Sequence, residues 1–278
     1  MHDFLRIIKI HTAGLALAVV SIVGMSFAVC ALLNNPDRGM MVWSDTHFAL
    51  LAVAIAPHDA PLRFAIGNYY FGDGTYDLKK AEGSFRDALA LDPHLERVHY
   101  QLARIYFMNS NFPSALAEID TEITLFPDFE RSYYVRGLIY GYANEPDKAI
   151  ADFKEFLRWK PESWAGHNDL AWVYFLKGDY KNSAATAREG LTYAPNNVWL
   201  LNSLGVALLN EGNPAEAEKS LTAALSVANK MTPEDWGRSY PGNNPSVYGD
   251  GLDAMKASIE RNLALIVAAN VKVDKSSP

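Results

Sequence analysis

Cysteine is almost absent from this sequence, which contains Cys30 and no other cysteine among 278 residues. A single thiol excludes an internal disulfide and a cysteine-based structural zinc site. Every residue after Cys30 is therefore thiol-free, a composition that suits an oxidising compartment. Positive charge is also scarce, because 25 Lys and Arg stand against 32 Asp and Glu, for a net charge of -7. That balance argues against nucleic-acid binding, which needs a surplus of basic side chains.

Catalytic and metal-binding motifs are missing as well. No two of the seven histidines form the i, i+4 pair with a nearby glutamate that is typical of a helical zinc site. The sequence also lacks a nucleophile elbow, a phosphate-binding glycine loop and a dinucleotide fingerprint. We therefore expect no enzyme activity, no cofactor and no metal ion. Hydrophobic residues make up 49% of the chain and charged residues 21%, which predicts a globular fold rather than disorder.

One long uncharged run stands near the N-terminus. Residues 12–33 cover 22 positions without a charged side chain. At a rise of about 1.5 Å per residue, a helix of this length spans the hydrocarbon core of a bilayer. Residues 34–36, with the sequence Asn-Asn-Pro, are typical of a helix end. The run therefore predicts a transmembrane signal anchor that stays in the membrane.

The charges around this run predict its orientation. Arg6 and Lys9 precede it within residues 1–11, whereas Arg38 is the only basic residue that follows before Arg63. The positive-inside rule then keeps the N-terminus in the cytoplasm and exports the remainder of the chain. We expect a single-pass protein of the inner (cytoplasmic) membrane whose folded part is periplasmic or otherwise extracytoplasmic.

Three other interpretations of the run stay open. It could be a cleaved secretory signal, because residues 26–28 place small side chains where a signal peptidase acts, and cleavage after Ala28 would release a soluble periplasmic protein. A lipoprotein acylated at Cys30 is less favoured, because Val29 stands where a small residue is expected. A buried helix of a soluble protein is the last alternative, and the position and flanks of the run fit a membrane segment better.

Proline recurs at a fixed interval in the rest of the chain. Pro93, Pro127, Pro161 and Pro195 are each 34 residues apart. Each follows one apolar helical pattern and precedes another, so each proline ends a helix and sets a corner. A regular period of this length indicates a repeat architecture, in which helix pairs stack and bury a continuous core.

The repeat resembles that of the tetratricopeptide-repeat family, whose unit is two antiparallel helices in 34 residues. With the prolines at position 32, the family's small residue at position 8 falls on Gly67, Ala103, Gly137, Ala171 and Gly205. The large apolar residue at position 24 falls on Phe85, Ile119, Phe153 and Leu221, while Ala187 departs from the pattern. The first repeat carries a two-residue insertion around residues 72–74.

The resemblance implies an all-α fold, a right-handed solenoid of about five helix-turn-helix repeats. A short apolar helix over 48–56, with an N-cap region at 44–46, is expected to cover the open end of the first repeat. Contact with the membrane surface or with a partner's transmembrane helix is its alternative role. The expected organisation is a cytoplasmic N-terminus (1–11), the anchor (12–33), a linker with the short helix (34–59), the solenoid (60–231), a loop (232–251), a capping helix (252–271) and a disordered tail (272–278).

In this family the first helix of each repeat lines a concave groove, usually through positions 2, 5, 9 and 12. The resemblance therefore implies partner-binding side chains at Arg97, Tyr100, Arg104, Arg131, Tyr134, Asn168, Trp172, Trp199 and Asn202. Phe107, Leu138 and Phe175 occupy further positions of the same set. Arg, Tyr and Trp are enriched at binding hot spots, and amide side chains can hold the backbone of an extended peptide. For Tyr134 and Trp172, packing against the next repeat is the alternative role.

Three further aromatic residues lie in the loop over 232–251: Trp236, Tyr240 and Tyr248. They either pack onto the solenoid or contact a partner. With the groove and the anchor, they predict a membrane-anchored interaction scaffold or adaptor that binds protein partners, an accessory or assembly factor of a cell-envelope or membrane complex. The alternatives are an enzyme or regulator of cell-wall or secretion machinery with an unrecognised site, and a soluble periplasmic repeat protein.

Overall fold

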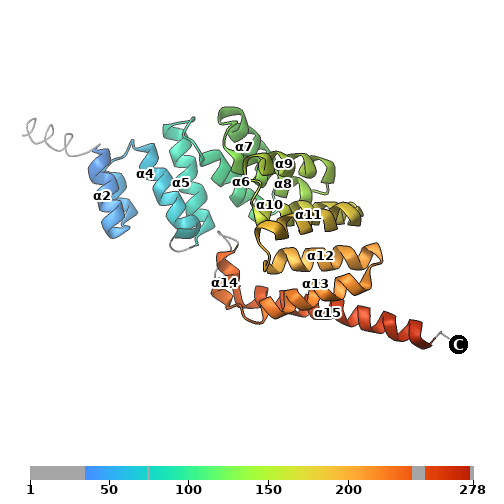
Figure 1. Cartoon of the computed structure of the whole chain (residues 1–278). Helices are drawn as coiled ribbons and strands as arrows, with labels where there is room; N and C mark the ends of the chain where they lie inside the picture. Colours follow the sequence, from blue (N-terminus) through green and yellow to red (C-terminus); the bar gives the residue numbers. More distant parts are fainter. Residues whose placement is uncertain (1–34, 74–75, 240–247, 276–278) are drawn as a thin grey trace, which may run out of the picture. The chain divides into compact units, whose positions relative to one another are not determined.

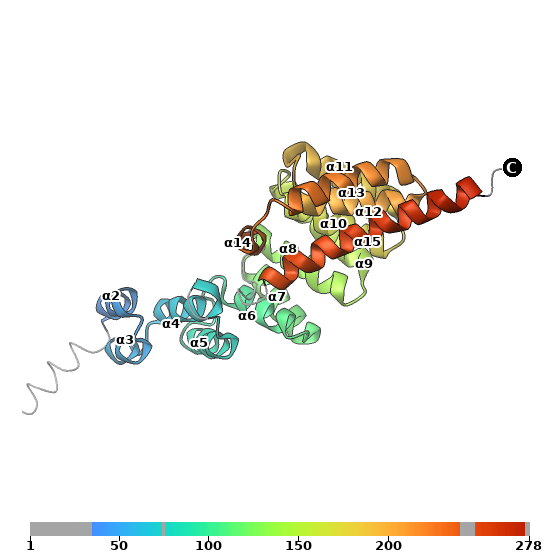
Figure 2. The same cartoon turned by 90° about the horizontal axis from the view of Figure 1, so that it is seen from below.

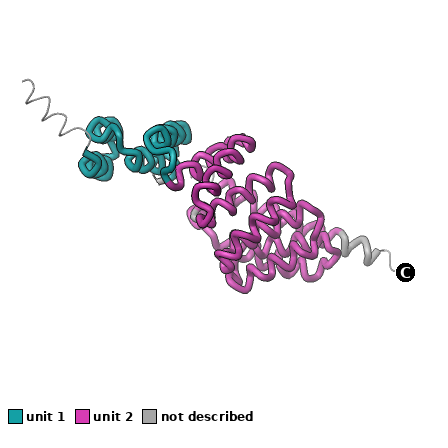
Figure 3. The backbone as a smooth tube through the Cα atoms, turned by 90° about the horizontal axis from the view of Figure 1, so that it is seen from above, with its two compact units in different colours: residues 1–95 teal, residues 96–278 magenta. Residues whose placement is uncertain are grey.

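The computed structural model describes residues 35–73, 76–239 and 248–275. All regular structure in those residues is helical (Figure 1). The chain divides into two compact units, residues 1–95 and 96–278 (Figure 3). None of the described helices is both long enough and apolar enough to cross a bilayer. The run over 12–33, for which a transmembrane helix is predicted, lies outside the described residues.

The described part of the first unit consists of a helical hairpin followed by the first repeat. Helices α4 and α5 are the two helices of that repeat, and a π-helical turn, η1, ends α4. The bounds are α2 (Pro36–Thr46), α3 (Ala49–Ile55), α4 (Ala60–Asn68), η1 (Tyr69–Asp73) and α5 (Leu78–Leu91).

Helix α2 corrects the prediction for residues 34–59, where the sequence predicts a single short helix. The side chain of Asn35 caps α2 by accepting a hydrogen bond from the backbone N–H of Arg38 at 3.0 Å, and Pro36 occupies the first turn. The Asn-Pro pair that is typical of a helix end therefore also begins a new helix. Residues 44–46, predicted as an N-cap region, are instead the last turn of α2, and α3 begins at Ala49.

The α2–α3 hairpin packs against α4 within the first unit. Its contact is a small apolar core made of Trp43, Ala52, Ala56, Leu62 and Ile66. These side chains are buried. The hairpin therefore packs against the first helix of the first repeat, where the sequence predicts a cover formed by one helix.

The two-residue insertion of the first repeat is absorbed at the end of α4. The five residues of η1 form a π-helical turn, a conformation that takes up additional residues within a helix. Asp77 then caps α5 by accepting the backbone N–H of Lys80 at 3.1 Å. The insertion leaves the packing of the repeat intact, because Phe85 of α5 still lies against Gly67 of α4.

The second unit continues the repeat with eight helices in four pairs. Asparagine, serine or aspartate side chains cap α7, α10, α11 and α12. The bounds are α6 (Val98–Met108), α7 (Phe112–Leu125), α8 (Glu130–Tyr142), α9 (Pro146–Trp159), α10 (Trp164–Leu176), α11 (Tyr180–Tyr193), α12 (Val198–Glu211) and α13 (Pro214–Ala228). With α4 and α5 they are the ten helices that five repeats require.

The C-terminal end is more helical than predicted. A short helix, α14 (Pro233–Arg238), stands where a loop is expected, and a capping box between Thr232 and Asp235 starts it. Helix α15 (Tyr248–Lys275) lies along α13 (Figure 2). Its predicted apolar stripe is confirmed, because Leu252, Ile259 and Ile266 are buried. The predicted disorder of the tail is wrong for residues 272–275, which are helical, and 276–278 lie outside the described residues.

Candidate functional site

The first helices of successive repeats contact one another directly through their side chains in the second unit. Four of these contacts join residues 35 positions apart, one more than the repeat length: Phe107–Tyr142, Tyr134–Asp169, Trp164–Trp199 and Asn168–Ser203. The regular offset shows that α6, α8, α10 and α12 present their side chains in a continuous row. We call the residues of these contacts, together with Trp172, the first-helix row.

One edge of the first-helix row is aromatic. The ring of Tyr142 lies 5.3 Å from that of Phe107 and 4.9 Å from that of Trp172, measured between centroids. These three residues come from α6, α8 and α10. Tyr142 is 59% exposed although it contacts both neighbours, so the edge remains accessible. Gly141 makes room for it, because a Cβ there would lie 2.7 Å from the Trp172 ring.

A polar line runs beside the aromatic edge. The Tyr134 hydroxyl donates to a carboxylate oxygen of Asp169 at 2.5 Å, and the Asn168 amide donates to the other oxygen at 3.0 Å. The Ser203 hydroxyl donates to the Asn168 side-chain oxygen at 2.9 Å. These bonds link α8, α10 and α12. Among the described residues no basic side chain pairs with Asp169, and its burial raises the pKa of the carboxyl to about 6, against the opposing effect of the two hydrogen bonds.

The last repeat adds a stacked tryptophan pair and an unsatisfied amide. The rings of Trp164 and Trp199 lie 5.3 Å apart at an angle of 29°. Next to Trp199 in the same helix turn, the side-chain oxygen of Asn202 is buried and has no hydrogen-bond partner in the described part of the chain. A buried acceptor without a donor is costly, so Asn202 is suited to receive a hydrogen bond from a ligand.

The arginines predicted for the groove gather at the start of the second unit. The Arg97 guanidinium lies 5.2 Å from the Phe129 ring, and the Arg104 guanidinium lies 5.5 Å from the Tyr100 ring. Tyr100 and Phe129 meet edge to face at 5.1 Å, so the four side chains form one cluster. Arg131 is exposed on α8. Both arginines of the cluster also bind a neighbour: Arg97 Nε lies 3.3 Å from a carboxylate oxygen of Glu96, and Arg104 donates to the side-chain oxygen of Gln101 at 2.8 Å.

The sequence-based site is therefore only partly reproduced as a connected surface. The structure brings Tyr134, Asn168 and Trp172 into the row and joins Trp199 to it through Trp164. The roles of the predicted residues as partner contacts stay predictions. Trp236 of α14 packs against Gly251 of α15, which favours the packing role for this aromatic residue. The side chains of Tyr240 and Tyr248 lie outside the described residues.

Sequence reasoning missed several members of the site: Tyr142, Trp164, Asp169, Ser203 and Phe129. The sequence carried a signal for Asp169, since it is the only residue among Asp, Glu, Lys and Arg in α10. Asp169 and Ser203 each stand one position after the expected groove position 5. Asp169 and Ser203 were missed because contacting residues are 35 positions apart, one more than the repeat length. The repeat length alone does not predict this offset.

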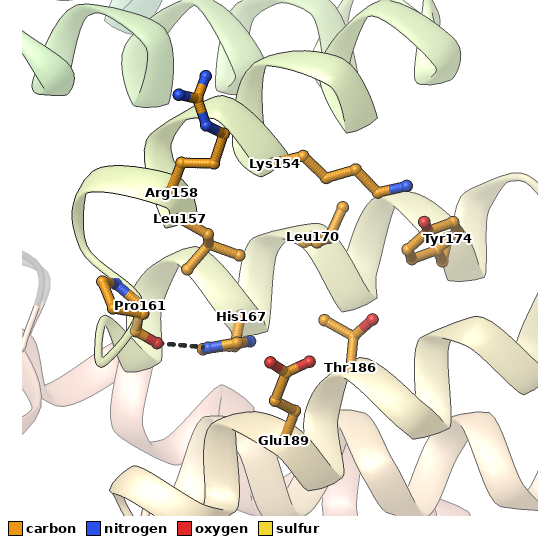
Figure 4. A pocket seen from close by; sticks show the side chains of 9 residues that line it. All are labelled: Lys154, Leu157, Arg158, Pro161, His167, Leu170, Tyr174, Thr186 and Glu189. Atoms are coloured by element: carbon orange, nitrogen blue, oxygen red, sulfur yellow. Dashed lines mark hydrogen bonds between the residues drawn. The ribbon is translucent and has the colours of Figure 1, made fainter.

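A surface pocket of about 320 Å³ opens between α9, α10 and α11 (Figure 4). His167 lies at its base, with Nε2 2.8 Å from the Pro161 carbonyl oxygen. The two basic side chains at the pocket are already engaged, Arg158 with Glu155 and Lys154 over the Tyr174 ring. None of the predicted groove residues lines it. We therefore place the candidate site on the first-helix row. In the described part of the chain no group of His, Cys, Asp and Glu side chains is arranged to hold a metal ion.

Comparison with known proteins places this arrangement among repeat proteins. Tetratricopeptide-repeat family models match residues 134–198 and 200–231. The TPR repeat-containing protein YpiA of Bacillus subtilis (strain 168) is 26% identical over 180 residues, which are 63% of this chain and 41% of YpiA. The chain thus spans well under half the length of that relative.

Solved structures share the fold at low sequence identity. The crystal structure of MamA superimposes with a TM-score of 0.54 and 19% identity, over 62% of this chain and 92% of MamA. YrrB, a TPR protein with an unusual peptide-binding site, gives a TM-score of 0.54 and 14% identity, over 66% of this chain and 93% of YrrB. PilW, a type IV pilus biogenesis factor, gives 0.57 and 16%, over 78% of this chain and 94% of PilW.

Proposed function

Because this chain is a tetratricopeptide-repeat protein, we propose that it is an interaction scaffold that binds a segment of a partner protein along the first-helix row. The observation that carries the proposal is the row itself. It combines an accessible aromatic edge, a buried acceptor line and an amide oxygen without a donor. The proposal assigns no reaction to the chain.

The chemistry of the row favours a particular kind of partner segment. The aromatic edge buries apolar or aromatic side chains, and large aromatic anchors dominate the energetics of most interfaces. The side-chain oxygen of Asn202, which has no donor within the described chain, would accept an N–H from an extended backbone or an amide side chain, whereas both oxygens of Asp169 already accept hydrogen bonds within the row. The arginine cluster around Tyr100 favours an acidic residue at one end of the segment.

We further propose that residues 12–33 anchor this scaffold in the inner membrane, with both folded units on the extracytoplasmic side. The uncharged run and the basic residues before it support this placement. Tethering raises the effective concentration of the scaffold towards other proteins of the same bilayer. The shared fold of PilW, a pilus biogenesis factor, is consistent with an accessory or assembly role at the cell envelope.

Site-directed photo-cross-linking in native membranes tests the binding surface. A benzophenone amino acid in place of Phe107 should give a discrete adduct with a partner protein. We expect Trp172→Ala and Arg104→Glu each to reduce the adduct at least several-fold, because the first removes an anchor ring and the second reverses the charge of the cluster.

The matched controls replace residues of the same types, Trp and Arg, at positions outside the first-helix row. Trp159→Ala and Arg188→Glu, on the second helices α9 and α11, should leave the adduct unchanged. Equal losses in all four variants, or no loss in any, would contradict the proposed surface. A cellular activity that survives Arg104→Glu and Trp172→Ala without a change in partner capture would favour the enzyme or regulator alternative. Mass spectrometry of the mature N-terminus decides between the anchor and the cleaved form, which would lack residues 1–28.

A further inference from the structure

The α2–α3 hairpin exposes more apolar surface than the first unit can cover. Leu50 is 77% exposed, Phe48 54% and Leu51 46%. Met41 of α2 is also exposed, at 55%. Phe48, Leu50 and Leu51 lie close together in sequence at the start of α3, and a cluster of exposed apolar side chains on a small folded unit marks an interaction site.

The exposed residues occupy one face of α3. Leu50, Leu51 and Ala54 are exposed at helical spacing, whereas Ala52 and Ala56 on the other face are fully buried. The sequence contains no Asp, Glu, Lys or Arg between residues 46 and 58. The face is therefore apolar along the whole helix, without the charged side chains that normally mark a surface in water.

The hairpin is firmly held, so this exposure is not the result of a loose helix. Helices α2 and α3 pack closely at Gly39, where an added Cβ would lie only 2.5 Å from the Cβ of Ala56. Trp43 is buried between the hairpin and α4 and meets the Tyr69 ring edge to face at 5.3 Å. The apolar face of α3 is thus presented on a fixed support.

The hairpin also stands at the point where the chain leaves the uncharged run. The run ends at residue 33, and α2 begins at Pro36. The backbone N–H of Asn35 donates to the carbonyl oxygen of Ile55 at 3.1 Å, so the end of α3 lies beside the start of α2. Residues 33 and 36 are three residues apart, a span of at most about 11 Å, and this distance bounds how far the start of α2 can be from the end of the run.

We propose that the apolar face of α3, with Phe48, lies in the interfacial layer of the bilayer that residues 12–33 enter. This inference rests on the proposed anchoring. An interfacial helix buries its apolar face roughly 5–10 Å into the boundary of headgroups and acyl chains, within reach of a hairpin tethered so closely. The face lacks lysine and arginine, so apolar burial rather than attraction to anionic lipid holds it there.

Lipid-depth quenching on the full chain tests the contact. Cys30→Ser removes the native thiol, and Leu50→Cys introduces a site for an environment-sensitive nitrobenzoxadiazole probe. The protein is reconstituted in vesicles of phosphatidylcholine and phosphatidylglycerol. We expect blue-shifted emission, several-fold stronger quenching by shallow doxyl lipids than by aqueous iodide, and the reverse preference for a probe at Leu176, an exposed leucine of the second unit. Circular dichroism of both labelled proteins checks that the fold is kept.

The outcomes separate this inference from the anchoring itself. Alkaline extraction of the same vesicles reports whether the chain is membrane-embedded. Retention in the membrane together with iodide quenching at Leu50 as strong as at Leu176 would overturn the interfacial contact and leave the anchor standing. Protection of the Leu50 probe from both quenchers would also overturn it, because a second copy or another protein would then cover the face. Release of the chain from the vesicles by alkali would contradict both the proposed membrane anchor and the interfacial contact of α3.

Discussion

At the scale of single residues, glycine at position 8 of a repeat faces phenylalanine or leucine at position 24. A Cβ on each of these glycines would lie 3.0 Å or less from that side chain. The two other repeats have alanine at position 8, with isoleucine or alanine at position 24. The glycine pairs are Gly67–Phe85, Gly137–Phe153 and Gly205–Leu221. Close approach of the two helices of a repeat therefore depends on one missing methyl group.

Replacing Gly205 with alanine should destabilise the second unit. A Cβ at this position would lie 2.5 Å from Leu221 Cγ and 3.3 Å from the Leu221 backbone nitrogen, and Leu221 is fully buried. Overpacking of this kind costs about 1–3 kcal/mol. Urea unfolding followed by circular dichroism measures the loss. The control is Gly83→Ala in α5, where a Cβ meets nothing within 4 Å, and we expect a gain of up to about 1 kcal/mol from helix propensity. Equal effects in both variants would show that the Leu221 contact does not matter.

At the scale of helices, one arginine joins three consecutive elements of the second unit. Arg136 of α8 donates through Nε and Nη2 to the two carboxylate oxygens of Asp152 in α9, both at 2.8 Å. Its Nη1 donates to Asp120 of α7, also at 2.8 Å. The hydrogen bonds to Asp152 raise the pKa of the guanidinium, while burial raises the pKa of the Asp152 carboxyl. The forked geometry of arginine suits it to hold two neighbouring second helices to one first helix.

Arg136→Met should lower the free energy of unfolding by about 2 kcal/mol, because it leaves the Asp152 carboxylate largely buried without a partner. Adding Asp152→Leu should restore much of the loss, since no unpaired charge remains. Arg188→Met breaks a pair with Glu216 in which both side chains are at least half exposed, and its cost should stay below about 1 kcal/mol. Chemical unfolding of these three variants and of the native chain gives the comparison. Similar losses for Arg136→Met and Arg188→Met would show that burial of the pair has no role.

The same scale shows which elements the sequence can predict. The four prolines at 34-residue spacing predict the repeat and with it the ten helices, because each of them follows the end of one helix and precedes the start of the next. Helix α2 is missed because Asn35 and Pro36 can end one helix and begin another, and only the fold decides between them. Helix α14 carries a readable signal, a threonine followed by Asp235 three residues later, but lies in a stretch rich in glycine and proline.

At the scale of the whole molecule, the repeat predicts a row of first helices but not the contacts within it. Tyr134 and Asp169 are 35 residues apart, as are Asn168 and Ser203, so each bond joins position 5 of one repeat to position 6 of the next. That register depends on how far one helix pair is rotated against its neighbour, a property of the packed solenoid. The sequence therefore predicts Tyr134 and Asn168 as candidate site residues but does not predict the residues that they contact.

The buried carboxyl of Asp169 should make the stability of the protein depend on pH with a defined sign. Its folded pKa is about 6, and an aspartate in an unfolded chain has a pKa of about 3.9. The folded state therefore holds the proton more tightly, and the contribution of this group to stability grows as the pH falls through 6 and levels off below the unfolded value. Between about pH 7 and pH 4.5 the native chain should gain about 2 kcal/mol of stability relative to Asp169→Asn.

The control is Asp147→Asn, which changes an exposed carboxylate, and its pH dependence should follow that of the native chain. Urea midpoints at the two pH values measure the difference, and parallel pH dependence of the native and Asp169→Asn proteins would show that the carboxyl of the row is not the titrating group.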